Sequence, residues 1–239
     1  MSSVLVQTGQ RLSALLGRQD DSVDRRELIA EIHDFLAMLE GIKPLLLHGR
    51  GLAPPNWIKE VLIIAHELGL YVTEGPFWDA TTYEASPDWY ANHCRKELQS
   101  YKAWYICKDT AIAKSVGRVN REAGYLSVSE EARLIGYPEC CVKAHYERSR
   151  RYHRGTLSIL KRVACGNENK MRQLLANKAT LVPVTRQELD DFKAAFDIHE
   201  PKLGSWNLCH ACAYGTDSPS DVLSERYREM VQKAKLANN

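Results

Sequence analysis

The stretch "GYPECCVKAHYER" (residues 136–148) places two adjacent cysteines directly after a helix stop and a helix start. Gly136 suits the left-handed conformation that ends many helices, and Pro138 is well tolerated in the first turn of the next one. Cys140 and Cys141 are therefore expected in the first turn of a new helix. Backbone N–H groups are unpaired there, and the positive end of the helix dipole lowers the pKa of a thiol. Because the thiolate is both the nucleophile and the metal ligand, this position predicts reactive or metal-binding cysteines.

A second cysteine cluster lies in the loop-like segment 198–217, where "CHAC" supplies Cys209 and Cys212. The C-x-x-C spacing lets two sulfur atoms converge on one centre from a turn. Together with Cys140 and Cys141 these residues form a predicted set of four thiolates, the four-cysteine set. The chain has seven cysteines, an odd number that favours thiols or ligands over structural disulfides. The remaining three are expected to be structural, as small apolar residues: Cys94, Cys107 and Cys165.

Several chemistries fit the four-cysteine set. An iron–sulfur cluster is favoured over zinc, because neighbouring side chains on a helix diverge and separate iron atoms can receive them. A zinc site made of Cys141, His145, Cys209 and Cys212 is an alternative, since His145 follows Cys141 by about one helical turn. Thiols without a metal can also carry out redox or sulfur-transfer chemistry. The simplest interpretation is that Cys140 and Cys141 only pack in a helix and that the C-x-x-C spacing is chance.

The helix that begins at the cysteine pair continues into the arginine-rich segment 145–162. If it remains helical, Arg148 and Arg151 lie within about a turn of the face that carries Cys141 and His145. Guanidinium groups bind phosphate and carboxylate, so these arginines predict a small anionic or phosphorylated substrate. A solvated helix face is the simpler interpretation. Two helices joined by Gly-Tyr-Pro also resemble a helix-turn-helix, which leaves nucleic acid as a less favoured partner.

Outward from this stretch, the two halves of the chain have different patterns. Before about residue 110, apolar spacing and caps predict helices at 22–41, 55–69 and 86–101 and short strands at 43–49, 71–75 and 103–109. After it, they predict helices at 127–136, 185–197 and 218–236 and a possible edge strand at 179–185. The fold class is therefore α+β and mostly helical, with a small mixed sheet in the N-terminal half and a helical C-terminal half that carries the cysteine-bearing loop. A single domain is expected over 1–239, with an N-terminal α/β portion at about 1–109 and a C-terminal portion at about 110–239.

The composition is that of an ordinary globular protein, with 44% hydrophobic and 26% charged residues. The net charge of +2 is too small to predict nucleic-acid binding by itself. No signal-peptide pattern and no run of 18 apolar residues is present, so we expect a cytoplasmic protein with no membrane partner. The motifs GxSxG, HExxH, GxGxxG and the Walker loop are absent, which disfavours conventional hydrolases and kinases.

The segment from about Ala103 to Cys212 resembles an uncharacterised prokaryotic family of unknown function. Its marks are a Leu/Ile-Gly-Tyr-Pro-x-Cys-Cys segment, here Ile135 to Cys141, and a later cysteine cluster, here Cys209 and Cys212. The resemblance brings no established activity. It implies at most an association with pathways that insert sulfur into a sugar or nucleoside.

These observations lead to one hypothesis about function and one alternative. The four-cysteine set is expected to bind an iron–sulfur cluster or zinc and to support sulfur-transfer or thiol chemistry, as a transferase, on a small anionic molecule. The hypothesis assigns catalysis to Cys140, Cys141 and His145 and substrate binding to Arg148 and Arg151. The alternative is a structural metal-binding module that recognises a partner protein or nucleic acid.

Overall fold

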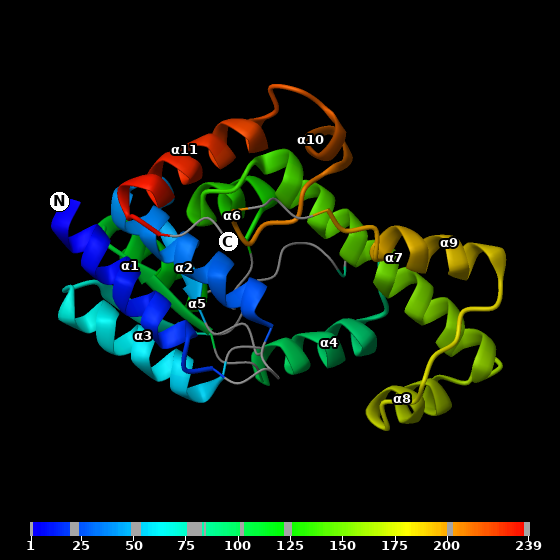
Figure 1. Cartoon of the computed structure of the whole chain (residues 1–239). Coiled ribbons are helices and arrows are strands. Elements are labelled where there is room, and N and C mark those ends of the chain that lie inside the picture. The colour runs from blue at the N-terminus through cyan, green and yellow to red at the C-terminus, as the bar shows by residue number, and fades with distance from the viewer. Residues whose placement is uncertain are drawn as a thin grey trace.

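The computed structural model describes residues 2–19, 24–48, 54–75, 83, 85–100, 103–121, 126–199 and 203–236 (Figure 1). These ranges contain eleven helices and three strands, so the mostly helical α+β class is confirmed. Within the same ranges, every helix is too short or too polar to cross a membrane. One contiguous cluster of buried apolar side chains extends from Leu5 to Ala234 and draws on both halves of the chain.

The three strands form one small sheet in the order β1-β3-β2. The strands are β1 (Leu45–His48), β2 (Tyr71–Gly75) and β3 (Ala103–Cys107). Both pairings with the central β3 are antiparallel, so the mixed sheet expected from sequence is replaced by an antiparallel one. The reason is that β3 enters between β1 and β2, which run in the same direction but are never neighbours. The apolar "AWYIC" of β3 suits this central, largely buried position.

Four helices contribute to the N-terminal part of the core: α1 (Ser2–Leu16), α2 (Arg25–Glu40), α3 (Pro55–Glu67) and α11 (Pro219–Lys233). Of these, α2 contacts β1 and α3 contacts β2. In α2, Asp24 caps the start and Gly41 ends the helix in the left-handed conformation. This helix packs against α1, β1 and α11, which buries most of its second half. The sequence pattern did not predict α1, whose apolar residues are spread among polar ones. The last helix in sequence, α11, thus lies beside the second (Figure 1).

The remaining helices are α4 (Asp88–Ser100), α5 (Thr110–Arg121), α6 (Val128–Ile135), α7 (Glu139–Val163), α8 (Glu168–Ala176), α9 (Arg186–Ala195) and α10 (His210–Tyr214). A capping box formed by Ser127 and Glu130 starts α6, and Gly136 ends it in the left-handed conformation. The long α7 follows at once. Its first half lies in the core, whereas its second half extends outward with α8 and α9 beside it (Figure 1).

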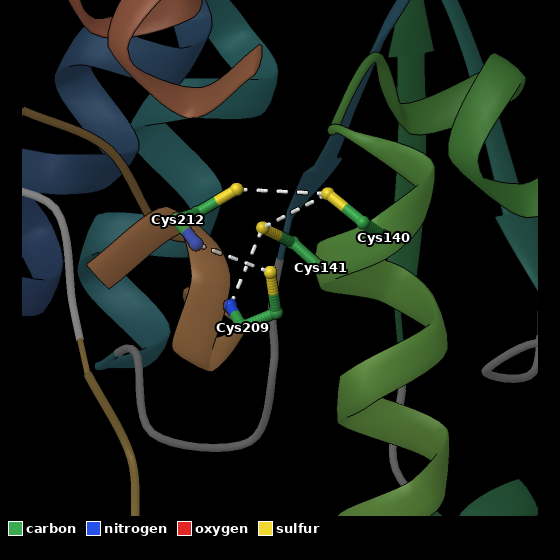
Figure 2. A group of neighbouring side chains, drawn as sticks. All are labelled: Cys140, Cys141, Cys209 and Cys212. Atoms are coloured by element: carbon green, nitrogen blue, oxygen red, sulfur yellow. Dashed lines mark hydrogen bonds between the residues drawn. The ribbon is translucent and has the colours of Figure 1, made fainter. Parts of the chain in front are cut away.

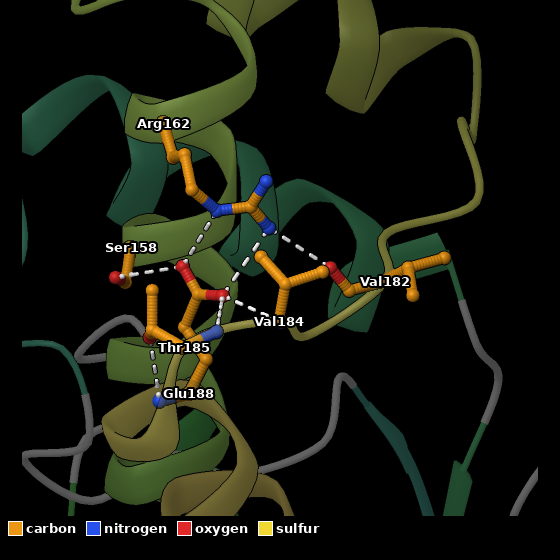
Figure 3. Close-up of polar contacts among 6 residues, drawn as sticks. All are labelled: Ser158, Arg162, Val182, Val184, Thr185 and Glu188. Carbon is orange, nitrogen blue, oxygen red and sulfur yellow. Dashed lines mark hydrogen bonds and ion pairs between the residues drawn. The ribbon is translucent and has the colours of Figure 1, made fainter.

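The edge strand predicted at 179–185 is wrong, because a buried carboxylate takes the backbone groups that a strand would use. Glu188 of α9 accepts hydrogen bonds from the backbone N–H groups of Val184 and Thr185, at 3.0 and 3.2 Å. Arg162 of α7 donates to Glu188 and also to the carbonyl oxygen of Val182, at 2.9 Å (Figure 3). The segment therefore connects α8 to α9, is hydrogen-bonded to α7, and does not pair with the sheet.

We expect acid to weaken the attachment of α9 to α7. The hydrogen bond from Arg162 lowers the pKa of Glu188 to about 2 against the effect of burial, and the N–H groups of Val184 and Thr185 add to the lowering. Because the folded-state pKa lies below the usual value near 4.5, the stabilisation is complete above that pH and is lost as the pH falls towards 2. Glu188→Gln should cost about 2 kcal/mol of unfolding free energy at pH 7. Denaturant unfolding at pH 7 and at about pH 3 should show this difference shrinking in acid.

The matched control is Glu168→Gln on α8, because Glu168 pairs with Arg172 on an exposed helix face. Its effect should stay within about 0.5 kcal/mol at both pH values. An equal cost of Glu188→Gln at neutral and acid pH would contradict the role given to its charge.

Candidate metal centre

The structure brings the four-cysteine set together. Cys140 and Cys141 lie at the second and third positions of α7, Cys209 is the N-cap of α10, and Cys212 lies within α10. All four Sγ atoms lie within 4.8 Å of one another (Figure 2). Three of these thiols are buried and Cys140 is exposed. A group of four converging thiols of this kind can hold a metal ion.

The sulfur atoms are close, and backbone N–H groups point at two of them. The Sγ atom of Cys140 lies 3.6 Å from that of Cys212 and 4.0 Å from that of Cys141. The N–H of Cys209 donates to Cys141 Sγ, and the N–H of Cys212 donates to Cys209 Sγ, both at 3.4 Å (Figure 2). Such donors favour sulfur as thiolate, which is the form that binds metal.

One buried carboxylate holds the two halves of the site together. Asp34 of α2 accepts hydrogen bonds from the hydroxyl of Tyr137, three residues before Cys140, and from that of Ser205, four residues before Cys209. Tyr227 of α11 donates to its other oxygen at 2.6 Å, and Lys43 donates at 2.9 Å. Burial would raise the pKa of Asp34, but Lys43 and the three hydroxyl donors outweigh it and hold that pKa below its usual value. Asp34 therefore fixes both segments as a charged hydrogen-bond acceptor.

Gly136 is required by close packing at the turn before α7. Its φ of +75° is the left-handed conformation that favours glycine. A Cβ atom here would lie 2.7 Å from Lys43 Cβ and 2.8 Å from Pro44 Cδ. The glycine thus lets the turn approach the segment that carries Lys43.

An aromatic side chain connects the loop to the cysteines. The ring of Trp206 lies between those of Tyr137 and Tyr227, with both centroids at 5.4 Å. Its Nε1–H donates to the hydroxyl of Ser220 at 3.3 Å, and that hydroxyl lies 3.3 Å from Cys141 Sγ. Trp206 and Ser220 therefore place the loop and α11 against the first cysteine pair.

The thiols differ in acidity in a way that the helix position alone did not predict. Burial raises the pKa of Cys141 to about 11, and burial together with the neighbouring thiols raises that of Cys140. Burial also acts on Cys212, but hydrogen bonds with Ser220 and the other three cysteines outweigh it and lower its pKa to about 7. The expected effect of the α7 dipole is thus overcome at its two cysteines. Four sulfurs this close can all ionise only if a cation lies among them.

The other predicted site residues separate into two groups. His145 lies outside the group of converging ligands, and its Nδ1 is 3.4 Å from Asn207 Nδ2. The guanidinium of Arg148 is half-buried, and its Nη1 donates to the carbonyl oxygen of Leu208 at 3.3 Å. His145 and Arg148 both line a cavity of about 690 Å³ that Cys141 also borders. Arg151 is exposed instead and pairs with Glu147 at 3.6 Å.

The cavity contains residues that the sequence did not single out. Cys94 and Tyr90 of α4 line it together with His153 of α7, and the Tyr90 hydroxyl lies 2.9 Å from His153 Nδ1. Burial lowers the pKa of His153 to about 4, so this ring is neutral at pH 7. The helical spacing of Cys141 and His145 indicated a shared face of α7, whereas His153 lies about 120° around the axis from Cys141 and could not be grouped with them. No pattern in the sequence indicated that α4 lies beside this face of α7.

No protein-family model, curated protein or solved structure matches this chain.

Proposed function

We propose that the protein binds a single metal ion at the four-cysteine set, with zinc in preference to an iron–sulfur cluster. The observation that carries this proposal is the mutual approach of all four Sγ atoms within 4.8 Å. Thiolates at about 2.3 Å from one tetrahedral zinc lie about 3.8 Å from each other. Two of the separations, Cys140–Cys212 at 3.6 Å and Cys140–Cys141 at 4.0 Å, lie on either side of this value. A cluster distributes its thiolates over separate iron atoms, which holds the sulfurs further apart.

Four protein ligands make a closed site, which is typical of structural zinc. Here the ion would join the first turn of α7 to α10, and through Ser220 to α11. In such sites the free energy of metal binding is also free energy of folding. The proposed role is therefore to hold the loop with Asn207 and Leu208 against α7, where it forms part of the cavity.

A second candidate function is thiol or sulfur-transfer chemistry on a small anionic molecule. One observation favours it: Cys141 belongs to the four-cysteine set and also borders the cavity. In this second candidate function, the cavity binds the anionic molecule and a thiolate of the four-cysteine set contacts it as the nucleophile. Cys140, the exposed member, would then be the thiol that reagents in solution reach first.

Metal analysis of protein purified without oxygen tests the leading proposal. We expect about one zinc per chain and a colourless protein. A brown protein that contains iron and sulfide would overturn the single-ion proposal in favour of a cluster. Protein that contains no metal and takes up none would overturn both the single-ion site and the iron–sulfur cluster.

Chelation of the same preparation separates the two candidate functions. If the ion is structural, its removal should lower the melting temperature by at least about 10 °C, because a contribution of several kcal/mol is lost. If the thiols serve chemistry alone, the chelated protein should keep its melting temperature while its thiols become reactive.

A further inference from the structure

The cavity beside the four-cysteine set has the size and walls of a small-molecule site. Its volume of about 690 Å³ is within the range of pockets that enclose such ligands. It lies between α4, α6, α7 and the segment 205–207. Much of its wall is aromatic: Tyr83, Tyr90, Tyr137, Tyr146, Tyr152 and Trp206. Flat rings on several sides favour a planar, partly apolar ligand.

Arg148 is the one arginine or lysine among the described residues that line this cavity. One of its terminal nitrogens, Nη1, donates to Leu208, but Nη2 is shielded from solvent and has no hydrogen-bond partner in the described part of the chain. Buried polar groups are normally satisfied, and an exception often marks the place of a ligand. A guanidinium with a spare N–H group matches an anionic oxygen.

The charge of the other wall residues restricts this anion. Glu97 and Glu131 also line the cavity, and the hydroxyl of Tyr146 donates to Glu131. These carboxylates would repel a doubly charged phosphate more strongly than a singly charged carboxylate. Among the anions that Arg148 could hold, the two carboxylates therefore favour one with a single negative charge.

We propose that this cavity binds a planar aromatic monocarboxylate whose carboxylate is held by Arg148. The proposal names the substrate class for the anionic molecule above, and it rests on the proposed function because the metal-held loop supplies one wall. Arg148 has a competing role, since it also lies near Cys141 and Cys209 and can balance the charge of their thiolates. The experiment must therefore measure ligand affinity and metal content together.

Three probes with the same ring and different charge test the proposal by calorimetric titration: 2-naphthoate, 2-naphthamide and 2-naphthyl phosphate. We expect one site for naphthoate, with the amide and the phosphate at least about tenfold weaker. Arg148→Met should remove the preference for naphthoate over the amide while the metal content stays at the wild-type value. Arg151→Met is the matched control, because Arg151 is exposed and pairs with Glu147, and it should bind all three probes as the wild type does.

Four results would overturn the proposal: no saturable binding of naphthoate, equal affinities for naphthoate and the amide, tighter binding of the phosphate, or an Arg148→Met protein that still prefers naphthoate. Loss of both metal and naphthoate binding in Arg148→Met would overturn it too, since Arg148 would then serve the thiolates. Wild-type protein that contains no metal, takes up none and still binds naphthoate through Arg148 would refute the metal proposal and leave the ligand proposal standing, because the loop would then form its wall without the ion.

Discussion

Cys209→Ser should remove most of the bound metal and lower the free energy of unfolding by at least about 3 kcal/mol. Cys209 is buried and is the N-cap of α10, where its sulfur accepts the N–H of Cys212. Serine is a favoured N-cap residue, so the substitution keeps the local cap while it replaces a thiolate ligand by a hydroxyl. The loss therefore reports on metal binding, and not on the start of the helix. Metal content and denaturant unfolding, measured on the same preparation, give both values.

Cys165→Ser is the matched control, because Cys165 is an exposed thiol in the turn after α7. It should retain the metal content and the stability of the wild type. If Cys209→Ser kept its metal, the four-cysteine set would not be the binding site.

The second large effect is expected at Asp34. Asp34→Asn keeps the shape of the side chain but leaves the ammonium of Lys43 buried without its counter-charge. Breaking a buried ion pair in this way costs about 3–5 kcal/mol. Because Tyr137 and Ser205 both donate to Asp34, the variant should also bind metal more weakly. Unfolding in denaturant and competition with a chelator measure the two consequences.

A double variant distinguishes the loss of charge balance from the loss of packing. Lys43→Met added to Asp34→Asn removes the unpaired charge, so it should recover a large part of the stability lost in the single variant. A cost below about 0.5 kcal/mol for Asp34→Asn alone would contradict a supporting role for this pair.

The features that depend on local sequence were predictable. The spacing of serine and an acidic residue identified the starts of α6 and α11, and both have the full capping box at Ser127 and Ser218. Gly136 was expected to end a helix and does so in the left-handed conformation. The four cysteines could be grouped because two close pairs in one chain are a strong signal for a shared centre.

The features that depend on distant contacts were not predictable. Asp34 lies in an amphipathic helix like any other charged residue, and its burial results from donors on four separate segments. The segment 179–185 has the composition of a strand, but Glu188 captures its backbone groups. Cys94 was expected to be a structural residue, but its position on α4 puts it in the wall of the cavity. In each case the structural role depends on residues outside the local sequence pattern from which the prediction was made.

The hydrogen bond from Tyr227 to Asp34 also affects when, during synthesis and folding, the contacts around the four-cysteine set can form. Tyr227 lies in α11, so the carboxylate that fixes Tyr137 gains its full set of donors only after this last helix has been synthesised and has returned to α2. Contacts between such distant parts of a chain form late, because a long loop must close first. During translation Cys141 therefore emerges well before α10 and α11, and its thiol is open to solvent until these helices have packed against it.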